Sequence, residues 1–276
     1  MMCAWQELLG VLPTWMRERT DSLGRGRLQE LRLRLDRPPE LIIGTERRSL
    51  DKPATQSDLT FVINAASKYS PWAAETVSKG FLTVTGGHRI GICGEAVTDR
   101  GILKGLKHIQ SLCIRVARDF HGIAEKLPMN GSVLIIGKPG SGKTTLLRDL
   151  IRQRSNRGIS SVAVIDERGE VFPKGFDRGS QTDVLTGCSK SFGIPMVLRT
   201  MGPGTIAVDE ITDKDDADAL YQTLWCGVEL LATAHAASYD DLQHREVYRK
   251  LLESGLFQTV VILQPDKSWR TERICL

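Results

Sequence analysis

The sequence predicts an α/β fold: a mostly parallel sheet with helices on both faces, preceded by a small α+β domain. Three observations carry this prediction. Short, nearly continuous apolar runs recur through residues 131–276 with helical patterns between them, as expected for strands buried on both faces of a parallel sheet. A glycine-rich turn follows the first of these runs. Residues 1–118 contain shorter stretches in which apolar and polar side chains alternate, the pattern of strands with one buried face.

The N-terminal region contains predicted strands in three places. Residues 28–43 alternate on either side of Arg37-Pro38-Pro39 and indicate a hairpin. Residues 80–97 indicate two further strands around Gly86-Gly87, and residues 109–118 indicate another.

A helical pattern covers residues 56–78, with a break at Ser70-Pro71 because proline disfavours helix in the residue before it. Residues 119–130 have the composition of a linker. We therefore expect an N-terminal α+β domain over 1–118, a linker over 119–130 and the α/β domain over 131–276.

The strands of the α/β domain are predicted from largely apolar runs of five or six residues. They are SVLIIG (132–137), SVAVID (161–166), TIAVDE (205–210), ELLATA (229–234) and TVVIL (259–263). The pattern KTTLLRDLIRQR after the first run predicts a helix.

Charge and cysteine usage exclude several classes of protein. The net charge of +4 is too small to indicate a nucleic-acid-binding protein by itself. Residues 1–120 hold 18 Lys/Arg and 13 Asp/Glu, so the basic excess lies in the N-terminal part. This excess indicates either a solvated surface or a surface for an anionic partner. The six cysteines lack CxxC spacing, which favours reduced thiols and a cytoplasmic protein, and no run is long enough for a membrane span.

The strongest motif is GKPGSGKT at residues 137–144, which matches G-x-x-x-x-G-K-[ST] between an apolar strand and a helix. Glycines let such a loop turn its backbone N–H groups toward phosphate oxygens, and the following helix adds its positive N-terminal end. Lys143 is expected to reach the β- and γ-phosphates, and the Thr144 hydroxyl to ligate Mg²⁺. The predicted nucleotide contacts are Gly137, Lys138, Pro139, Gly140, Ser141, Gly142, Lys143, Thr144 and Thr145.

Acidic residues end two of the predicted strands. Because the carboxyl ends of parallel strands meet at one edge of the sheet, we expect these carboxylates beside the phosphates. Asp209 is the natural metal-side residue and holds Mg²⁺ through water. Glu167 or Asp166 is the predicted base that orients the attacking water, and Glu210 remains a third candidate.

His235 follows the strand ELLATA at the same predicted sheet edge. From this position its imidazole could hydrogen-bond a γ-phosphate and respond to hydrolysis. A packed or surface histidine is the alternative.

The order of the P-loop, VIDERGE, LRTMGPGTIAVDE and TAHAAS resembles the Walker A, Asp box, Walker B and His box of type II and type IV secretion ATPases. The chain is most similar to one branch, the stage III sporulation protein AA family, and the resemblance covers nearly the whole sequence. The residues that carry it are 29–41, 86–97, 111–119, 137–150, 165–170 and 209–211. One departure is Asp209-Glu210, where secretion ATPases generally have Gly-Glu.

The resemblance implies a RecA-like P-loop ATPase core behind a small N-terminal domain, a hexameric ring, and hydrolysis of ATP with Mg²⁺. It also implies arginines that reach the nucleotide from the N-terminal domain and linker. The matching positions are Arg89 and either Arg115 or Arg118, and Arg199 matches an arginine that precedes the Walker B segment. Guanidinium groups suit this role because they stabilise charge that develops on the transferring phosphoryl group.

The resemblance further implies a cytoplasmic motor on the mother-cell side during endospore formation. It would energise a secretion-like channel beside a membrane-bound partner encoded in the same operon. A single-stranded nucleic-acid-dependent ATPase is the alternative, supported by the basic N-terminal part. Few aromatic residues accompany the Lys and Arg residues, so no base-stacking surface is evident. A small-molecule P-loop kinase would leave the His box and the N-terminal match unexplained.

Overall fold

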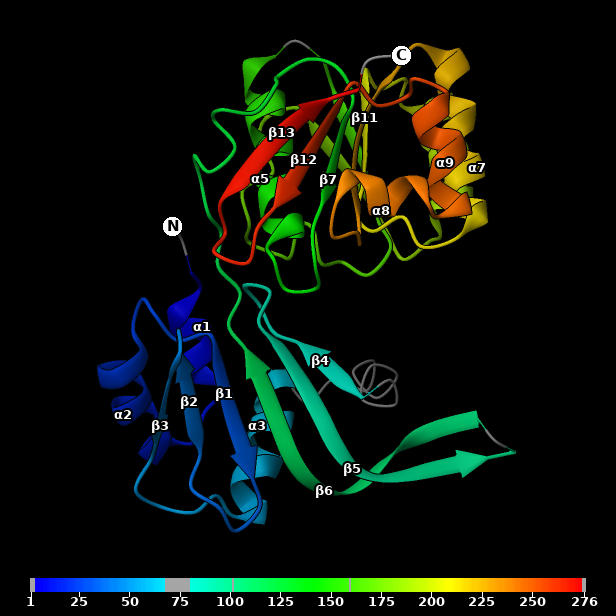
Figure 1. The fold of residues 1–276 in the computed structure, drawn as a ribbon. Helices are drawn as coiled ribbons and strands as arrows, with labels where there is room; N and C mark the ends of the chain where they lie inside the picture. The colour runs from blue at the N-terminus through cyan, green and yellow to red at the C-terminus, as the bar shows by residue number, and fades with distance from the viewer. Residues whose placement is uncertain (1–2, 68–79, 101, 159, 275–276) are drawn as a thin grey trace. The chain divides into compact units, whose positions relative to one another are not determined.

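A computed structural model describes residues 3–67, 80–100, 102–158 and 160–274. The chain divides into two compact units (Figure 1). The N-terminal unit comprises residues 1–119 with 173–176, and the C-terminal unit comprises 120–172 with 177–276.

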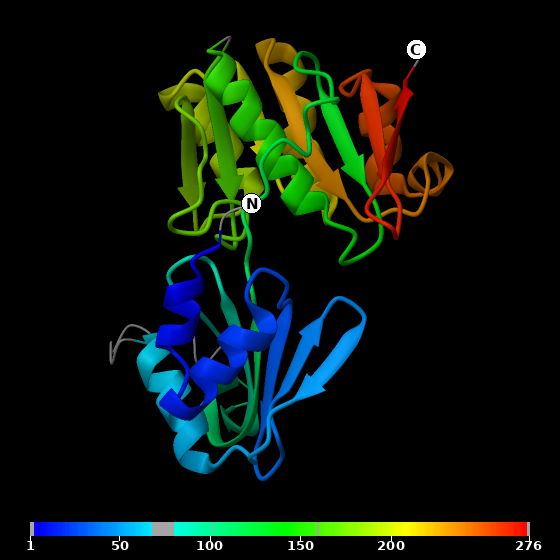
Figure 2. The same ribbon diagram turned by 90° about the vertical axis from the view of Figure 1, so that its left-hand side faces the viewer.

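The N-terminal unit is built on a six-stranded antiparallel sheet in the order β3-β2-β1-β6-β5-β4. Its strands are β1 (Glu30–Arg34), β2 (Glu40–Ile43), β3 (Glu46–Ser49), β4 (Phe81–Thr83), β5 (Arg89–Asp99) and β6 (Ile102–Arg115). Alternate strand residues such as Leu31, Leu33 and Ile114 are fully buried. They pack with the helices α1 (Trp5–Gly10), α2 (Thr14–Gly24) and α3 (Gln56–Ser67) in one core, and Figure 2 shows these helices on one face of the sheet.

The predicted hairpin at 28–43 is confirmed by the antiparallel pairs of β1 and β2, and the predicted pair within 80–97 by those of β4 and β5. The strand predicted at 109–118 begins earlier, at Ile102. Its outer half escaped prediction because residues 93–99 of the facing strand β5 are all exposed, so no apolar alternation marks the pair. The predicted helix at 56–78 corresponds to α3, and the break at Ser70-Pro71 lies outside the described residues.

His88 joins the start of the described chain to the last residues of this unit. Its side chain is fully buried, and its Nδ1 accepts a hydrogen bond from the Ala117 N–H at 3.1 Å. Nε2 therefore carries the proton and donates to the Ala4 carbonyl at 2.9 Å. Burial lowers the pKa of His88 from its ordinary value of 6.5, against a smaller opposing effect of the Ala4 carbonyl.

Acid should weaken the N-terminal unit through His88. When the pH falls below 6.5, the unfolded chain binds a proton that the folded chain does not, so the free energy of unfolding decreases. At higher pH the stabilisation is fully present. Urea unfolding at about pH 5.5 and about pH 7.5 should show this loss in the free energy of unfolding, and hydrogen exchange of the Ala117 N–H should show it locally. His88→Gln cannot titrate, and an unchanged pH dependence in that variant would contradict the assignment.

The C-terminal unit has a seven-stranded sheet in the order β13-β12-β7-β11-β10-β8-β9. Six of these strands are parallel, and β13 is antiparallel to β12. The strands are β7 (Val133–Ile136), β8 (Val162–Asp166), β9 (Thr182–Thr186), β10 (Thr205–Val208), β11 (Glu229–Ala234), β12 (Thr259–Leu263) and β13 (Trp269–Arg273). All five predicted strands are thus present. The edge strands β9 and β13 carry too many polar residues to stand out in the sequence.

Helices cover both faces of this sheet, as predicted. The helix α5 (Lys143–Arg157) packs in one core, and α6 (Lys190–Thr200), α7 (Lys214–Gln222) and α9 (Glu246–Glu253) pack in another. The short helices η1 (Thr223–Cys226) and α8 (Tyr239–Gln243) complete the unit. Among the described residues, we find no helix with the length and apolar character that crossing a bilayer requires.

The segment 119–130, predicted as a linker, packs largely within the C-terminal unit. Ala124 and Leu127 are buried in the core beside α5. The N–H groups of Gly122 and Ala124 donate to the Asp149 carboxylate of α5 at 3.2 and 2.8 Å. The structure therefore begins this unit at Phe120.

Candidate nucleotide-binding site

The loop 137–144 connects β7 to α5 at the carboxyl edge of the parallel sheet. Gly140 and Gly142 have φ angles of 73° and 106°, which side chains rarely permit. A Cβ on Gly137 would lie 2.6 Å from the Ser141 Oγ, so the loop also requires glycine there. Lys267, in the turn after β12, donates to the Gly140 carbonyl at 2.6 Å. The sequence thus builds a tight loop at the position where phosphates bind in α/β sheets.

Lys143 is the first residue of α5 and is 7% exposed. Its Nζ donates to the carbonyls of Gly137 and Lys138 at 3.1 and 3.2 Å and lies 2.9 Å from the His235 Nδ1. Burial lowers the pKa of Lys143, although the nearby carboxylates of Asp209 and Glu210 oppose this effect. An anionic phosphate would stabilise the buried ammonium more strongly than backbone carbonyls do.

Thr144 and Asp209 place side-chain oxygen atoms of the kind that bind Mg²⁺ next to each other. The Thr144 Oγ1 donates to the Asp209 Oδ2 at 2.8 Å, and the Thr233 hydroxyl of β11 donates to the Asp209 Oδ1 at 2.6 Å. Oxygen ligands of this kind suit Mg²⁺ bound together with substrate phosphates. The Ser141 Oγ is buried with no hydrogen-bond partner among the described residues, as a group awaiting a ligand oxygen would be. The site therefore fits a magnesium–nucleotide complex.

His235 and Glu210 extend this arrangement away from the loop. Because the Lys143 ammonium can only donate, the His235 Nδ1 accepts. The protonated Nε2 then donates to the Glu210 Oε1 at 2.9 Å. Glu210 has a φ angle of 55°, and its N–H donates to the Thr233 Oγ1 at 2.8 Å. A chain of contacts thus joins the loop lysine to the glutamate after β10.

Asp166 and Glu167 differ in their surroundings although they are neighbours in sequence. Asp166 is 2% exposed and accepts hydrogen bonds from the N–H groups of Glu170, Val171 and Phe172 at 2.8, 2.9 and 3.1 Å. These bonds give Asp166 a structural role in the turn after β8. The Glu167 side chain is 46% exposed and pairs with Lys190 at 3.2 Å.

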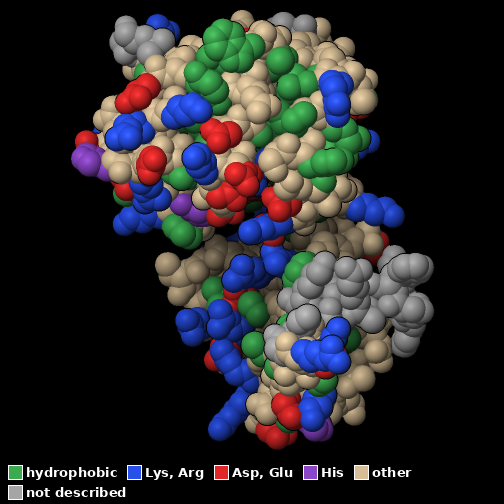
Figure 3. Space-filling model, turned by 90° about the vertical axis from the view of Figure 1, so that its right-hand side faces the viewer, with side chains coloured by type: hydrophobic (Ala, Val, Ile, Leu, Met, Phe, Trp, Pro, Cys, Tyr) green, Lys and Arg blue, Asp and Glu red, His purple; other side chains and the backbone are tan. Residues whose placement is uncertain are grey.

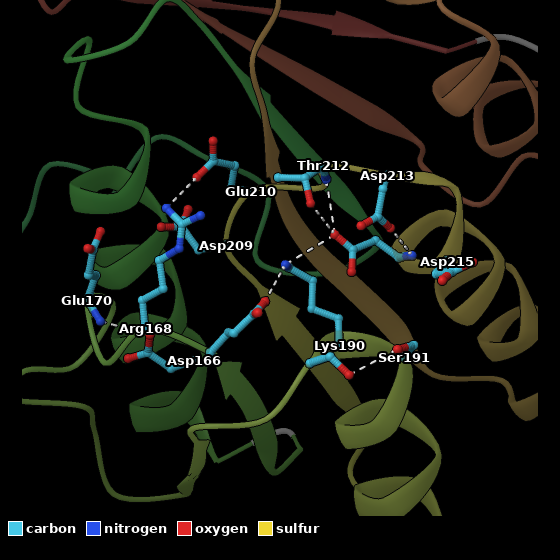
Figure 4. Close-up of a pocket in the computed structure, with 13 residues that line it drawn as sticks. Asp166, Arg168, Glu170, Lys190, Ser191, Asp209, Glu210, Thr212, Asp213 and Asp215 are labelled. Carbon is cyan, nitrogen blue, oxygen red and sulfur yellow. Dashed lines mark hydrogen bonds and ion pairs between the residues drawn. The ribbon is translucent and has the colours of Figure 1, made fainter. Parts of the chain in front are cut away.

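These carboxylates line a cavity of about 220 Å³ at the ends of β8 and β10 (Figure 4). The Arg168 side chain points toward Glu210, and its Nη1 lies 3.7 Å from the Glu210 Oε2. The full lining is Asp166, Glu167, Arg168, Glu170, Ser189, Lys190, Ser191, Asp209, Glu210, Thr212, Asp213, Asp215 and Asp216. Carboxylates dominate this lining, so the cavity favours water, a metal ion or cationic groups.

A profile of the family described as "Sporulation stage III, protein AA" matches residues 6–273. The chain belongs to this family. It is 36% identical over 280 residues to the stage III sporulation protein AA of Bacillus subtilis (strain 168), a match that covers 95% of this chain and 91% of that protein. The family predicted from the order of the motifs is therefore confirmed.

Solved structures confirm the fold of this family member. The Legionella pneumophila ATPase DotB is similar with a TM-score of 0.60 and 17% identity, over 94% of this chain and 78% of that chain. The pilus retraction motor PilT with bound ADP gives a TM-score of 0.64 and 15% identity, over 95% and 78%. These likenesses confirm the RecA-like P-loop fold.

The predicted arginines lie in different places. Arg89 and Arg115 are direct cross-strand partners on β5 and β6, and the Arg89 guanidinium lies 4.3 Å from the Phe81 ring centroid. The Arg115 Nε also lies 3.8 Å from the Glu30 Oε2 of β1, so a carboxylate accompanies this pair. Arg118 donates to the Leu28 carbonyl at 2.8 Å, and Arg199 to the Pro195 carbonyl of α6 at 3.3 Å.

Sequence reasoning missed three residues that organise the site. Thr233 binds Asp209 and Glu210, Arg168 approaches Glu210, and Lys190 holds Glu167. Arg168 lies inside the motif VIDERGE, and Thr233 lies two residues before His235. These positions could have identified both residues as site candidates. Lys190 carries no such signal, because it lies outside the four motifs, at the start of α6.

Proposed function

We propose that this protein is a Mg²⁺-dependent ATP hydrolase of the secretion-ATPase type. One observation supports this most directly: the loop residues Lys143 and Thr144 contact His235 and Asp209 from two other strand ends. This arrangement brings phosphate-binding, metal-binding and acid–base groups to one sheet edge, as P-loop hydrolysis requires.

Each group has a distinct proposed task. The loop N–H groups and Lys143 bind the phosphates, and Thr144 and Asp209 hold Mg²⁺, in the case of Asp209 through water. The ion would neutralise charge on the β- and γ-phosphates. PilT, which shares this fold, was solved with ADP.

Glu210 is the proposed residue that orients the attacking water. Its carboxylate contacts His235, which contacts the phosphate-binding lysine, whereas both oxygens of Asp166 already accept backbone hydrogen bonds. Glu167 lines the same cavity and is the second carboxylate of the reaction.

His235 is proposed to respond to the nucleotide. In the described structure it accepts from Lys143, a contact that the lysine would give up in order to bind phosphate. The imidazole would then be free to turn toward the γ-phosphate, and its contact with Glu210 would change with it. Nucleotide binding and hydrolysis would thereby change the conformation of the chain at His235, directly after β11.

The proposed assembly is a hexameric ring in which arginines from the N-terminal domain complete the site. The cross-strand placement of Arg89 and Arg115 supports this role, because two neighbouring guanidinium groups could meet one phosphate. Arg118 and Arg199 remain weaker candidates.

Arg89→Ala should lower kcat for ATP by roughly 10²-fold or more if Arg89 acts as an arginine finger. Arg47→Ala, which removes an exposed arginine from β3 of the same sheet, is the matched control and should retain full activity. Arg89→Ala that hydrolyses ATP at the wild-type rate would remove Arg89 from the mechanism.

The family supports a biological role in endospore formation. We propose that the ring acts in the cytoplasm on the mother-cell side. There it would energise a secretion-like channel through a membrane-bound component encoded in the same operon.

Nucleic-acid-dependent ATP hydrolysis is the second candidate, and the basic N-terminal part favours it. On the face drawn in Figure 3, blue Lys and Arg side chains are spread over this part.

The test is steady-state ATP hydrolysis by the purified chain with Mg²⁺, with and without single-stranded DNA, and after chelation of the metal. We expect hydrolysis to require Mg²⁺ and to be unaffected by DNA. The rate per chain should rise with protein concentration as the ring assembles. A large, salt-sensitive stimulation by DNA would favour the second candidate.

A further inference from the structure

Lys190 occupies an unfavourable place for a lysine. It is the first residue of α6, where the helix dipole disfavours positive charge, and it is only 4% exposed. Burying an ammonium costs free energy unless carboxylates accompany it. A lysine at this position therefore contributes little to the stability of the fold. The contacts of its ammonium group explain better why it is there.

The ammonium contacts two carboxylates, one in the turn after β8 and one in the first turn of α7. The Lys190 Nζ lies 3.2 Å from the Glu167 Oε2 and 3.2 Å from the Asp216 Oδ2. In Figure 4, dashed lines run from the ammonium of the labelled Lys190 to two carboxylate groups. Glu167 follows β8 directly, and Asp216 lies in the first turn of α7. Lys190 thus connects the segment after β8 to the helix that follows β10.

Asp216 carries this connection to the loop after β10. Its Oδ2 accepts from the Thr212 N–H at 3.1 Å and from the Thr212 Oγ1 at 2.9 Å. Thr212 is two residues after Glu210, the proposed water-orienting residue. Asp216 is only 5% exposed, so burial keeps its carboxylate in contact with these partners. The contacts Glu167–Lys190–Asp216–Thr212 thereby fix one side of the cavity relative to the other.

We propose that Lys190 is a positioning residue for hydrolysis, which holds the Glu167 carboxylate at a set place relative to the loop that carries Asp209 and Glu210. The proposal rests on the proposed ATPase function. Without the ammonium, a glutamate side chain that is 46% exposed could take many rotamers. Among the described residues, the ion pairs of Lys190 are with Glu167 and Asp216 and not with the loop 137–144, so the proposal gives it no part in binding the nucleotide.

The test compares kcat, KM for ATP and Kd for ADP in Lys190→Met. We expect kcat to fall about 10- to 100-fold, the loss that misplacement of a reacting group produces. KM and Kd should stay within about threefold of the wild type. Lys190→Arg should recover part of kcat, since it keeps the charge but not the compact ammonium.

A double variant separates positioning from general loss of stability. If Lys190 acts through Glu167, then Lys190→Met/Glu167→Gln should be no slower than the slower single variant. Multiplying effects would overturn the proposal. Lys250→Met is the matched control: Lys250 also pairs with an aspartate, Asp218, at 3.2 Å, but on the surface of α9. It should keep wild-type kcat.

The remaining outcomes are also decisive. A wild-type chain without ATPase activity would overturn the proposed function and this inference together. An active wild type with unchanged kcat in Lys190→Met, or with a loss confined to KM, would overturn the inference alone. If Lys190→Met does not fold, Lys190→Gln carries the test, because it removes the charge but keeps a polar side chain, and wild-type kcat in that variant would overturn the proposal.

Discussion

Glu210→Gln should bind ATP normally and hydrolyse it about 10²- to 10³-fold more slowly, the loss expected when one precisely placed polar group is removed from a transition state. The glutamine keeps the size of the side chain and can still meet the His235 Nε2 through its carbonyl oxygen. It cannot accept a proton from water or carry the negative charge that orients it. Single-turnover hydrolysis and equilibrium binding of ATP, measured on the same preparation, would show the two effects separately.

The neighbouring carboxylates provide the comparison. Glu167→Gln should lose about 10- to 100-fold, since it removes a positioned group that we do not propose as the base. Asp166→Asn should reduce stability by about 1–3 kcal/mol, because an amide nitrogen would face backbone N–H groups that need an acceptor. Normal turnover in Glu210→Gln together with a stalled Glu167→Gln would return the role of base to Glu167.

Lys143→Ala should abolish turnover and greatly weaken ATP binding. The lysine is the one loop side chain with contacts to the loop carbonyls and to His235, so its removal takes away phosphate charge compensation and separates the loop from Glu210. We expect affinity for ATP to fall by at least about 10²-fold, as for loss of a buried charged contact to phosphate. Isothermal titration with ATP and Mg²⁺ measures the change.

The same variant should fold as well as the wild type when nucleotide is absent. Burial lowers the pKa of Lys143, which means that the charged form is disfavoured in its surroundings, and alanine relieves that penalty. Lys143→Arg keeps the charge but not the shape, and should also lose turnover. A marked fall in the melting temperature of nucleotide-free Lys143→Ala would mean that its inactivity reports unfolding.

The loop 137–144 and the strands around it were predictable because their sequence is dictated locally. Buried parallel strands must be apolar on both faces, and the loop needs glycine where φ is positive, as at Gly140 and Gly142. The edge strands β9 and β13 were not predictable, since each has one partner and tolerates polar residues. The same holds for β3, whose four residues are all exposed.

The distribution of tasks among the carboxylates needed three-dimensional contacts. In sequence, Asp166 and Glu167 are equivalent candidates, and only the backbone N–H groups of residues 170–172 distinguish them. The role of Lys190 also could not be predicted from the sequence, because its partners Glu167 and Asp216 lie 23 and 26 residues away along the chain. Helical and strand patterns report burial, but they do not report which buried charges meet.

The strand order of the C-terminal unit also determines when the site can form during synthesis. β7, which carries the phosphate-binding loop, pairs with β11 and β12, and both are made more than 90 residues after it. A nascent chain that has just left the ribosome with Lys143 therefore lacks both neighbours of the strand on which the loop is built. Closing such long loops slows folding, and the unpaired apolar edges of β7 are exposed to other chains meanwhile. The phosphate-binding loop is therefore expected to reach its final surroundings, and to gain stability from nucleotide, only after β12 has been translated.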